Sequence, residues 1–359
     1  MSEKTSRRSL LQNTALAAGA AALLAKKVSG QGSADASVSA DQQAWKRIFP
    51  PGFRNEKIKT TGAVINAVIG GSGPPLLMFH GAPQSLITWR LIAPDLAKDY
   101  TVVLADLRGY GDSSRPPDAP DHSSQSKRPM ALDGVEVMEH LGFKKFRMVG
   151  HDRGGRVGRR MALDHPDRVL KLAVLDIVPA HYLYSHVTIE FVQAYFHWFN
   201  YLRPAPGPEN DLLAQNTGRG GGGGRGAGKG GPGPAGPGPG GPPRAGKGPV
   251  DEIAALVQAE YARHNSDPTM LHGMCEDYRA SASIDLKNDE ADIKAGKKIK
   301  CPLLTLWAEK GAMGTLYDVL KIWKEEGTHV SGKGLPGNHS LQESAPKETL
   351  AELQAFLRG

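Results

Sequence analysis

The feature that most constrains the fold of this chain is a Gly-x-Asp-x-Gly turn at residues 150–154. A short apolar run, 146–149, leads into the turn, and a helix-compatible stretch, 157–163, follows it. The two glycines permit a tight backbone, which pushes the middle side chain, Asp152, outward. A carboxylate at the apex of such a strand–turn–helix junction can attack a carbon atom and form an ester. The pattern therefore predicts that Asp152 is a nucleophile.

The rest of the chain predicts an α/β fold. Short apolar runs, typical of buried strands, alternate with helical stretches, and this alternation indicates a mostly parallel sheet with helices on both faces. A hairpin or edge strand is expected at 57–68. The other predicted strands are 76–79, 101–105, 146–149, 169–175, 302–307 and 328–335, and the predicted helices between and after them are 86–96, 127–141, 157–163 and 346–357.

The alternation stops between residues 180 and 295, where we predict an inserted helical cap. This insertion divides the core into a first part, 45–179, and a second part, 296–359. The cap is expected to contain an aromatic helix at 187–202 and two further helices at 250–264 and 269–282. A Gly/Pro-rich run at 212–250 has too few apolar side chains to bury a core, so we predict a disordered loop there.

The formal net charge of +7 does not point to nucleic acid. The surplus of basic residues is concentrated in segments 1–31 and 218–248, and the remaining chain is close to neutral. Segment 1–31, with Ser6-Arg7-Arg8-Ser9 before a weakly apolar run, is typical of a twin-arginine export signal, although an amphipathic helix is the alternative. We therefore predict a periplasmic protein without a permanent membrane span, in which residues 32–44 form a linker.

Two loops complete the predicted catalytic machinery around Asp152. His80-Gly81-Ala82-Pro83 follows the strand 76–79, and the backbone N–H groups of Ala82 and Arg153 are predicted to form an oxyanion hole. His339 follows the last predicted strand, which is where this architecture places a general base. The carboxylate that orients His339 is either Asp176, after the strand 169–175, or Glu309, after the strand 302–307.

The side chains near the nucleophile indicate an anionic substrate. Arg153 and Arg156 lie within four residues of Asp152, and two guanidinium groups match a carboxylate, unless they pair with acidic neighbours. In the predicted cap, the ring N–H groups of His197 and Trp198 can donate to a small leaving anion, and the hydroxyl group of Tyr261 can do the same. Packing against the core is the alternative role for these three. The two cysteines, Cys275 and Cys301, are too few for a metal cluster, and we predict no metal.

These residues together resemble the haloacetate dehalogenases, the fluoroacetate dehalogenase branch of the α/β-hydrolases. The resemblance runs from about residue 45 to the end of the chain, outside 212–250. The motifs that carry it are Phe79-His80-Gly81-Ala82-Pro83-Gln84, Ala105-Asp106-Leu107-Arg108-Gly109-Tyr110-Gly111, His151-Asp152-Arg153-Gly154-Gly155-Arg156, Leu172-Ala173-Val174-Leu175-Asp176-Ile177, His197-Trp198 and Met274-Cys275-Glu276-Asp277-Tyr278-Arg279-Ala280.

The resemblance implies an activity and assigns roles. Asp152 displaces halide from the α-carbon of a 2-haloacid, while Arg153 and Arg156 hold the substrate carboxylate. His197, Trp198 and Tyr261 receive the halide. His339, oriented by Asp176 rather than Glu309, activates the water that hydrolyses the ester. The implied partner is a small haloacid, and no cofactor is implied.

Two other functions stay open, as does a homodimer. An epoxide hydrolase of the same fold would need two tyrosines aimed at the epoxide oxygen, and Tyr195, Tyr201 and Tyr261 are candidates. Both epoxide hydrolases and haloalkane dehalogenases usually carry Trp directly after the nucleophile, where this chain has Arg153. A catalytically silent binding protein is the third hypothesis, since a fold alone does not determine function.

Overall fold

The computed structural model describes residues 44–218 and 251–359. The predicted export signal, all but the last residue of the predicted linker, and residues 219–250 of the Gly-rich run lie outside these ranges. The export signal and the disordered loop therefore stay predictions. Within the described ranges, no helix has both the length and the apolar character needed to cross a bilayer.

In the described residues, eight strands form one sheet in the order β1-β2-β4-β3-β5-β6-β7-β8. β1 and β2 form an antiparallel hairpin at one edge, β2 pairs antiparallel with β4, and all other pairs are parallel. The predicted mostly parallel sheet is confirmed. The strands are β1 (Arg54–Lys59), β2 (Val64–Gly70), β3 (Pro75–Phe79), β4 (Thr101–Ala105), β5 (Phe146–His151), β6 (Val169–Leu175), β7 (Leu303–Ala308) and β8 (Val330–Leu335).

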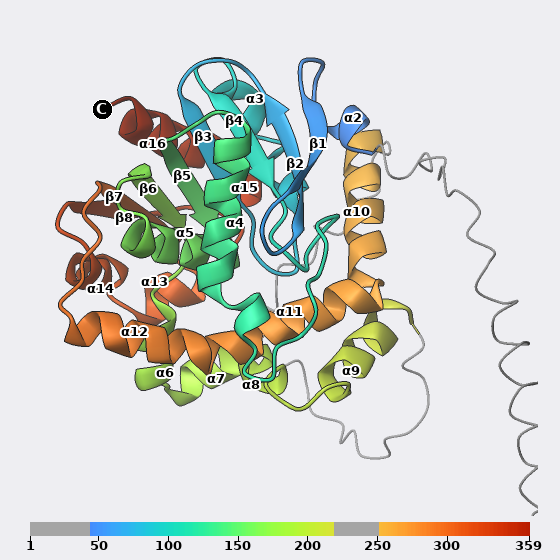
Figure 1. Ribbon diagram of the computed structural model, residues 1–359, viewed down its shortest axis with the longest axis vertical. Coiled ribbons are helices and arrows are strands. Elements are labelled where there is room, and N and C mark those ends of the chain that lie inside the picture. Colours follow the sequence, from blue (N-terminus) through green and yellow to red (C-terminus); the bar gives the residue numbers. More distant parts are fainter. Residues whose placement is uncertain (1–43, 219–250) are drawn as a thin grey trace, which may run out of the picture. The chain divides into compact units, whose positions relative to one another are not determined.

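The helices and 3-10 turns of the core domain come before β6 or after β7 in the sequence (Figure 1). They are α2 (Trp45–Ile48), η2 (Leu86–Trp89), α3 (Ala93–Leu96), η3 (Ser123–Gln125), α4 (Lys127–His140), α5 (Arg153–Asp164), α13 (Ala312–Leu316), α14 (Val319–Glu326), α15 (Leu341–Ser344) and α16 (Pro346–Arg358). The single helix predicted at 86–96 is wrong, because η2 and α3 are separate short turns. Pro94 lies in the first turn of α3 and cannot donate the backbone hydrogen bond of a continuous helix.

In the part of the chain that the structure describes, seven helices stand between β6 and β7, and we call them the inserted helices. They are α6 (Ala180–Ser185), α7 (Ile189–Ala194), α8 (Phe196–Asn200), α9 (Gly207–Asn216), α10 (Glu252–Asn265), α11 (Pro268–Ser281) and α12 (Ile284–Lys294). The two helices predicted at 250–264 and 269–282 are confirmed as α10 and α11, whereas α6, α9 and α12 were not predicted. α9 continues through Asn216, so the predicted start of the loop at residue 212 is wrong.

The aromatic helix predicted at 187–202 is also wrong as one continuous element. It is divided into α7 and α8 at Tyr195, whose φ of −126° and ψ of 36° are not helical. The break lets the Tyr195 ring stack on Phe191, with centroids 5.2 Å apart, and approach the ring of His339, with centroids 6.4 Å apart. Tertiary packing of aromatic rings therefore overrides the local helical pattern.

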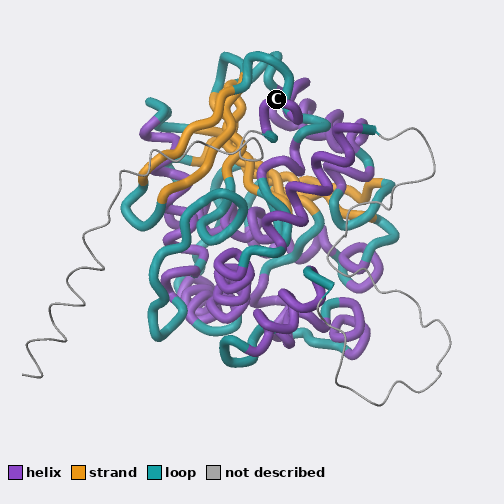
Figure 2. Tube along the Cα trace, turned by 90° about the vertical axis from the view of Figure 1, so that its right-hand side faces the viewer, coloured by secondary structure: helices purple, strands orange, loops and turns teal. Residues whose placement is uncertain are grey.

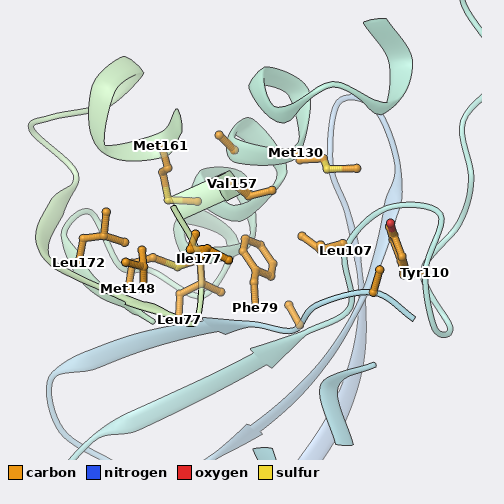
Figure 3. Packing of buried hydrophobic residues seen from close by; sticks show 14 of the residues in the cluster. Leu77, Phe79, Leu107, Tyr110, Met130, Met148, Val157, Met161, Leu172 and Ile177 are labelled. Carbon is orange, nitrogen blue, oxygen red and sulfur yellow. The ribbon is translucent and has the colours of Figure 1, made fainter. Parts of the chain in front are cut away.

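The sheet lies between helices, with strands in orange and helices in purple in Figure 2. Alternate residues of β3 enter two separate cores. Leu77 and Phe79 pack with Val157 and Met161 of α5 on one face (Figure 3), whereas Leu76 and Met78 pack with side chains of α16 on the other face. Because successive side chains of a strand point to opposite faces, a fully apolar run such as β3 needs helices on both sides of the sheet.

The inserted helices are tied to α5 by buried ion pairs. Arg159 and Arg160 of α5 both contact Asp289 of α12, at 2.7 and 2.6 Å. Arg160 also pairs with Asp292, one turn further along α12. Removing one partner of a buried pair leaves an uncompensated charge, so these contacts fix α12 against the second half of α5.

The junction between β5 and α5 fits closely against β3. A β-carbon on Gly154 would lie 2.5 Å from the carbonyl oxygen atoms of both Phe79 and His80. The N–H group of Gly154 also donates to the oxygen of His80, at 2.9 Å. Glycine is required here because backbone, rather than a flexible side chain, occupies the space.

Substituting Gly154→Ala is therefore expected to lower the free energy of unfolding by about 2 kcal/mol, because the backbone of β3 has to shift. Gly207→Ala is a matched control, since a β-carbon there meets nothing within 4 Å. It is expected to change stability by less than about 1 kcal/mol. Urea unfolding followed by circular dichroism measures both. Equal effects of the two substitutions would contradict the close fit.

Candidate active site

Asp152 lies between the end of β5 and the start of α5, with a φ of 43°. Such a positive φ costs a non-glycine residue on the order of 1–3 kcal/mol and is concentrated at functional sites. The backbone N–H group of Asp152 donates to the oxygen of Leu175 at 3.3 Å, which ties the turn to β6. The predicted apex is thus present, although Asp152 as a residue is only 5% exposed.

Two donors hold the Asp152 carboxylate, one at each of its oxygen atoms. The N–H group of Ala82 donates to Oδ2 at 3.1 Å, and Nη1 of Arg156 donates to Oδ1 at 2.9 Å. Burial alone would raise the pKa of this carboxyl group, but the positive charges of Arg156, His339 and Arg153 lower it below its ordinary range. Asp152 is therefore an ionised carboxylate at neutral pH.

His339 and Asp176 form a pair. Nδ1 of His339 lies 2.6 Å from Oδ2 of Asp176, whose Oδ1 accepts the N–H group of Ala308 at 2.8 Å. Burial lowers the pKa of His339, but its hydrogen bond with Asp176 and the charges of Asp176 and Asp152 raise it above the ordinary value. Asp176 therefore holds the imidazole from its Nδ1 side and leaves Nε2 for chemistry.

Glu309, the alternative acid, is not in a position comparable to that of Asp176. It follows β7 as predicted, but it is exposed, and its backbone N–H group donates to Leu335 at the neighbouring strand. Of the two candidate carboxylates, the structure thus brings only Asp176 to the ring of His339. Asp176 also has a positive φ of 51°, the same kind of backbone strain as Asp152.

His151 was not predicted as a site residue. Its Nε2 lies 2.9 Å from the backbone oxygen of His339, and the two imidazole rings are 4.8 Å apart. Burial lowers the pKa of His151 to about 3, so the ring is neutral and can donate to that oxygen without adding charge. His151 connects the turn that carries Asp152 to the loop that carries His339. Its place directly before Asp152, within a motif that carries the family resemblance, was the signal in the sequence.

The two predicted carboxylate-binding arginines have different partners. Arg153 is fully buried, and Asp277 of α11 accepts from its Nε at 2.8 Å and from its Nη2 at 2.7 Å. Arg156 instead contacts Asp152, the predicted nucleophile. Among the described residues, Nη1 of Arg153 and Nε of Arg156 are buried and have no hydrogen-bond partner. Each arginine therefore has one buried N–H direction without an acceptor among the described residues.

Aromatic rings form the wall against which both guanidinium groups lie. The Cζ atoms of Arg153 and Arg156 are 5.6 and 4.7 Å from the centroid of the Trp198 ring. Cζ of Arg153 is also 4.2 Å from the centroid of Tyr278. Cation–π contacts of this kind stabilise buried cations without using their N–H groups. Trp198 thus reaches the predicted substrate site, as well as packing in the core.

Asp277 is a second residue that the sequence did not single out, although it lies within a matching motif. It accepts hydrogen bonds from Arg153, Tyr110 and Lys127, and it is completely buried. All three donors belong to the core, whereas Asp277 belongs to an inserted helix. An acidic residue on the buried face of α11 was a usable signal, because a buried carboxylate requires cationic partners.

His197 and Tyr261, two of the three predicted halide ligands, line a common cavity of about 500 Å³. Burial lowers the pKa of His197 to about 4, so this imidazole is neutral. The hydroxyl group of Tyr261 donates to Oε1 of Glu343 at 3.3 Å rather than pointing free into the cavity. Ala82 also lines the cavity, which links it to the nucleophile that Ala82 contacts.

In residues 44–218 and 251–359, no group of three or more His, Cys, Asp or Glu side chains has the geometry of a metal site. Cys275 and Cys301 are both free thiols. The N–H group of Arg153, the second predicted oxyanion donor, opens α5 directly after the nucleophile, and its role stays a prediction.

Comparison with known proteins gives a consistent assignment. The family model of the alpha/beta hydrolase fold matches residues 74–326. The chain is 41% identical to the fluoroacetate dehalogenase of Burkholderia sp, over 85% of this chain and 94% of that protein. It is 44% identical to a soluble epoxide hydrolase of Corynebacterium sp. (strain C12), over 80% of this chain and 91% of that protein.

A solved structure shows the same relationship. The crystal structure of ALR0039 from Nostoc sp PCC 7120, which is assigned to the alpha/beta hydrolases, is 44% identical and has a TM-score of 0.73. The alignment covers 85% of this chain and 98% of that one. The chain therefore belongs to the alpha/beta hydrolase fold family, and it is a hydrolase of the haloacetate dehalogenase-like type.

Proposed function

We propose that this hydrolase removes halide from a 2-haloacid of the haloacetate type through a covalent ester on Asp152. The observation that carries the proposal is the pair of uncommitted, buried N–H groups on Arg153 and Arg156. A buried guanidinium N–H without an acceptor is costly, and two of them lie along one aromatic wall beside the nucleophile. A substrate carboxylate supplies both acceptors.

In the first step, an oxygen of Asp152 bonds to the α-carbon of the substrate while the carbon–halogen bond breaks. The carboxylate held by the two arginines points the α-carbon at Asp152. The halide leaves toward His197 and Trp198, whose ring N–H groups donate to it. Tyr261 becomes a third donor when its hydroxyl group turns away from Glu343.

In the second step, His339 takes a proton from water, and the hydroxide attacks the ester carbon of Asp152. Oδ2 of Asp152 already accepts the N–H group of Ala82, so the oxyanion that forms on this atom has a donor in place. The intermediate releases the hydroxy acid and regenerates the carboxylate. Overall, the haloacid and water are converted into hydroxy acid, halide and one proton. Asp152 supplies the attacking carboxylate, and His339 supplies the base.

Relatives support the proposal and its alternative. The Burkholderia relative is a fluoroacetate dehalogenase, and the Corynebacterium relative is a soluble epoxide hydrolase. Two of the three candidate tyrosines, Tyr201 and Tyr261, line the same cavity, which keeps an epoxide as the second candidate substrate. A catalytically silent binding protein is the third candidate.

The test is to measure halide and glycolate released from chloroacetate and fluoroacetate, alongside diol formed from styrene oxide. Release of equal amounts of halide and glycolate is expected. Diol formation without halide release would favour the epoxide hydrolase. No turnover of either compound, together with unchanged ligand binding by Asp152→Ala, would favour a binding protein.

The pH dependence should follow His339. Its raised pKa means that the base is protonated, and the ester step fails, as pH falls through a value above the ordinary 6.5. The lowered pKa of Asp152 places its own loss of charge far below that range. The acidic limb of kcat is therefore expected above pH 6.5, and Asp176→Asn should lower kcat by about 10²–10⁴-fold and move the limb to lower pH.

Glu309→Gln is the matched control, because Glu309 was the competing acid and is exposed. This variant should retain the wild-type kcat, and the acidic limb of its pH profile should stay at the wild-type pH. If Glu309→Gln shifts the limb and Asp176→Asn does not, then the choice of Asp176 is wrong. Initial rates between pH 5 and 9 with chloroacetate provide the measurement.

A further inference from the structure

The cavity beside the site is much larger than a haloacetate requires. Its volume is about 500 Å³, whereas a haloacetate has only a handful of non-hydrogen atoms. Cavities of roughly 300–1,000 Å³ are typical of sites that enclose drug-sized ligands. Four inserted helices, α8–α11, and the loop after β3 form its wall (Figure 1). The volume indicates that the substrate has a further portion.

The position of the cavity indicates where that portion is attached. His197 and Tyr261, the proposed leaving-group ligands, are part of the wall. Among the described residues, Asp152, Arg153 and Arg156 are not part of it. The leaving-group side of the site therefore opens into the cavity, which Ala82 and Tyr278 also line. A departing halide carries no substituent into this space. The oxygen of an opening epoxide stays bonded to the neighbouring carbon, whose substituent extends on the leaving-group side.

We propose that this site also hydrolyses 2,3-epoxy acids with an apolar substituent on C3, producing 2,3-dihydroxy acids. The inference rests on the proposed nucleophile and carboxylate site of the dehalogenase. The acid group lies at Arg153 and Arg156, the ring oxygen lies at His197 and Tyr261, and the C3 substituent occupies the cavity. An acid group distinguishes these substrates from the neutral epoxides of an ordinary epoxide hydrolase.

The chemistry of the wall suits a short carbon chain. Leu212 of α9 and Leu271 and Met274 of α11 supply apolar surface. Amide side chains, including Asn200 and Asn265, supply uncharged polar groups, and the acidic lining residue Asp211 is paired with Arg203. Burying one methylene group strengthens binding by about fourfold, so a propyl substituent is expected to raise kcat/KM by at least about tenfold.

The reaction balances with the groups present. An oxygen of Asp152 bonds to C2 while the bond between C2 and the ring oxygen breaks. The resulting alkoxide on C3 takes a proton from the hydroxyl group of Tyr261. Water activated by His339 then hydrolyses the ester at the Asp152 carbonyl carbon, and the proton on His339 passes to the departing C2 oxygen. The regenerated carboxyl group loses its proton, which returns through solvent to Tyr261.

The experiment compares kcat/KM for four compounds with the full-length protein. They are chloroacetate, 2,3-epoxypropanoate, trans-2,3-epoxyhexanoate, and neutral trans-2,3-epoxyhexane, in which a methyl group replaces the carboxylate. Dihydroxy acid and diol are measured by mass spectrometry after blank hydrolysis is subtracted. We expect the hexanoate to exceed the propanoate by at least about tenfold and the neutral epoxide by at least about a hundredfold.

Two variants of α9 test the location of the substituent. Leu212→Trp should fill part of the cavity, lowering kcat/KM for epoxyhexanoate about tenfold while leaving epoxypropanoate and chloroacetate within about twofold. Leu213→Trp is the matched control, because Leu213 packs against the core as Leu212 does but does not line the cavity. It should leave the ratio of kcat/KM between the two epoxy acids unchanged. Thermal melting checks that both variants are folded.

The outcomes separate this inference from the proposed dehalogenation. Turnover of chloroacetate without any dihydroxy acid overturns the inference alone. Turnover of epoxy acids without halide release overturns the dehalogenation and supports the inference. An equal kcat/KM for the two epoxy acids, or the same response to Leu212→Trp and Leu213→Trp, overturns the placement in the cavity. If none of the four compounds is turned over, both the inference and the proposed dehalogenation are overturned.

Discussion

The variant His339→Asn is expected to stop after the first chemical step and to accumulate an ester on Asp152. The carboxylate remains buried, ionised and in contact with Ala82 and Arg156, so the attack does not depend on His339 as a base. Hydrolysis of the ester does depend on it, and this step should slow by about 10³–10⁴-fold. Mass spectrometry of the peptide containing Asp152 should find the added mass of the substrate without its halogen.

Two controls make this result specific. The double variant Asp152→Asn with His339→Asn should show no added mass, because the nucleophile is gone. One equivalent of halide should appear in a burst with His339→Asn, in proportion to the modified peptide. If the wild type is active and neither burst nor adduct is seen in the single variant, then covalent catalysis by Asp152 is wrong.

The variant Arg153→Gln is expected to lower kcat/KM for chloroacetate by about 10²–10³-fold. Arg153 holds an uncommitted N–H group for the substrate carboxylate, and losing one partner of a buried charged hydrogen bond costs about 2–5 kcal/mol. KM should rise more than kcat falls, because Asp152 keeps its contact with Arg156 and stays ionised. A neutral epoxide should be affected by less than about tenfold, since it has no carboxylate to lose.

Arg160→Gln is the matched control for this prediction. Arg160 lies on the same helix, is equally buried and also pairs with carboxylates of an inserted helix, but its partners are Asp289 and Asp292. Both substitutions remove a buried guanidinium group, so both should lower the melting temperature. Only Arg153→Gln should lose affinity for the acid substrate. If both variants lose activity equally, then Arg153 acts through stability, and its proposed role is wrong.

The sheet and the nucleophile turn could be predicted from the sequence because both have strong local signals. Four consecutive apolar residues at 76–79 can only be buried on both faces, and β3 is buried in that way. The glycines at 150 and 154 indicated a tight turn, and Gly154 does lie against the backbone of β3. At these positions, the residue types of a short segment are enough to indicate its backbone geometry.

The helices over the site were less predictable because their limits depend on contacts made elsewhere. The helix expected at 187–202 breaks at Tyr195, whose ring packs on Phe191 and approaches His339. Nothing within that stretch specifies a ring more than 100 residues later in the chain. The same holds for α9, which forms by packing against α11 at the start of a run whose composition favours a loop.

The sequence by itself identified the groups that are proposed to carry the chemistry of this protein. Asp152 between two glycines, His339 after the last strand, and Arg153 and Arg156 beside the nucleophile depend on residue type and spacing, which the chain carries directly. Only the tertiary structure decided which groups are partners. Asp176 rather than Glu309 contacts His339, Asp277 takes two of the N–H groups of Arg153, and Glu343 takes the hydroxyl group of Tyr261. The reason is physical: the charge and hydrogen-bond capacity left over for a substrate depend on neighbours that lie close in space and far apart along the chain.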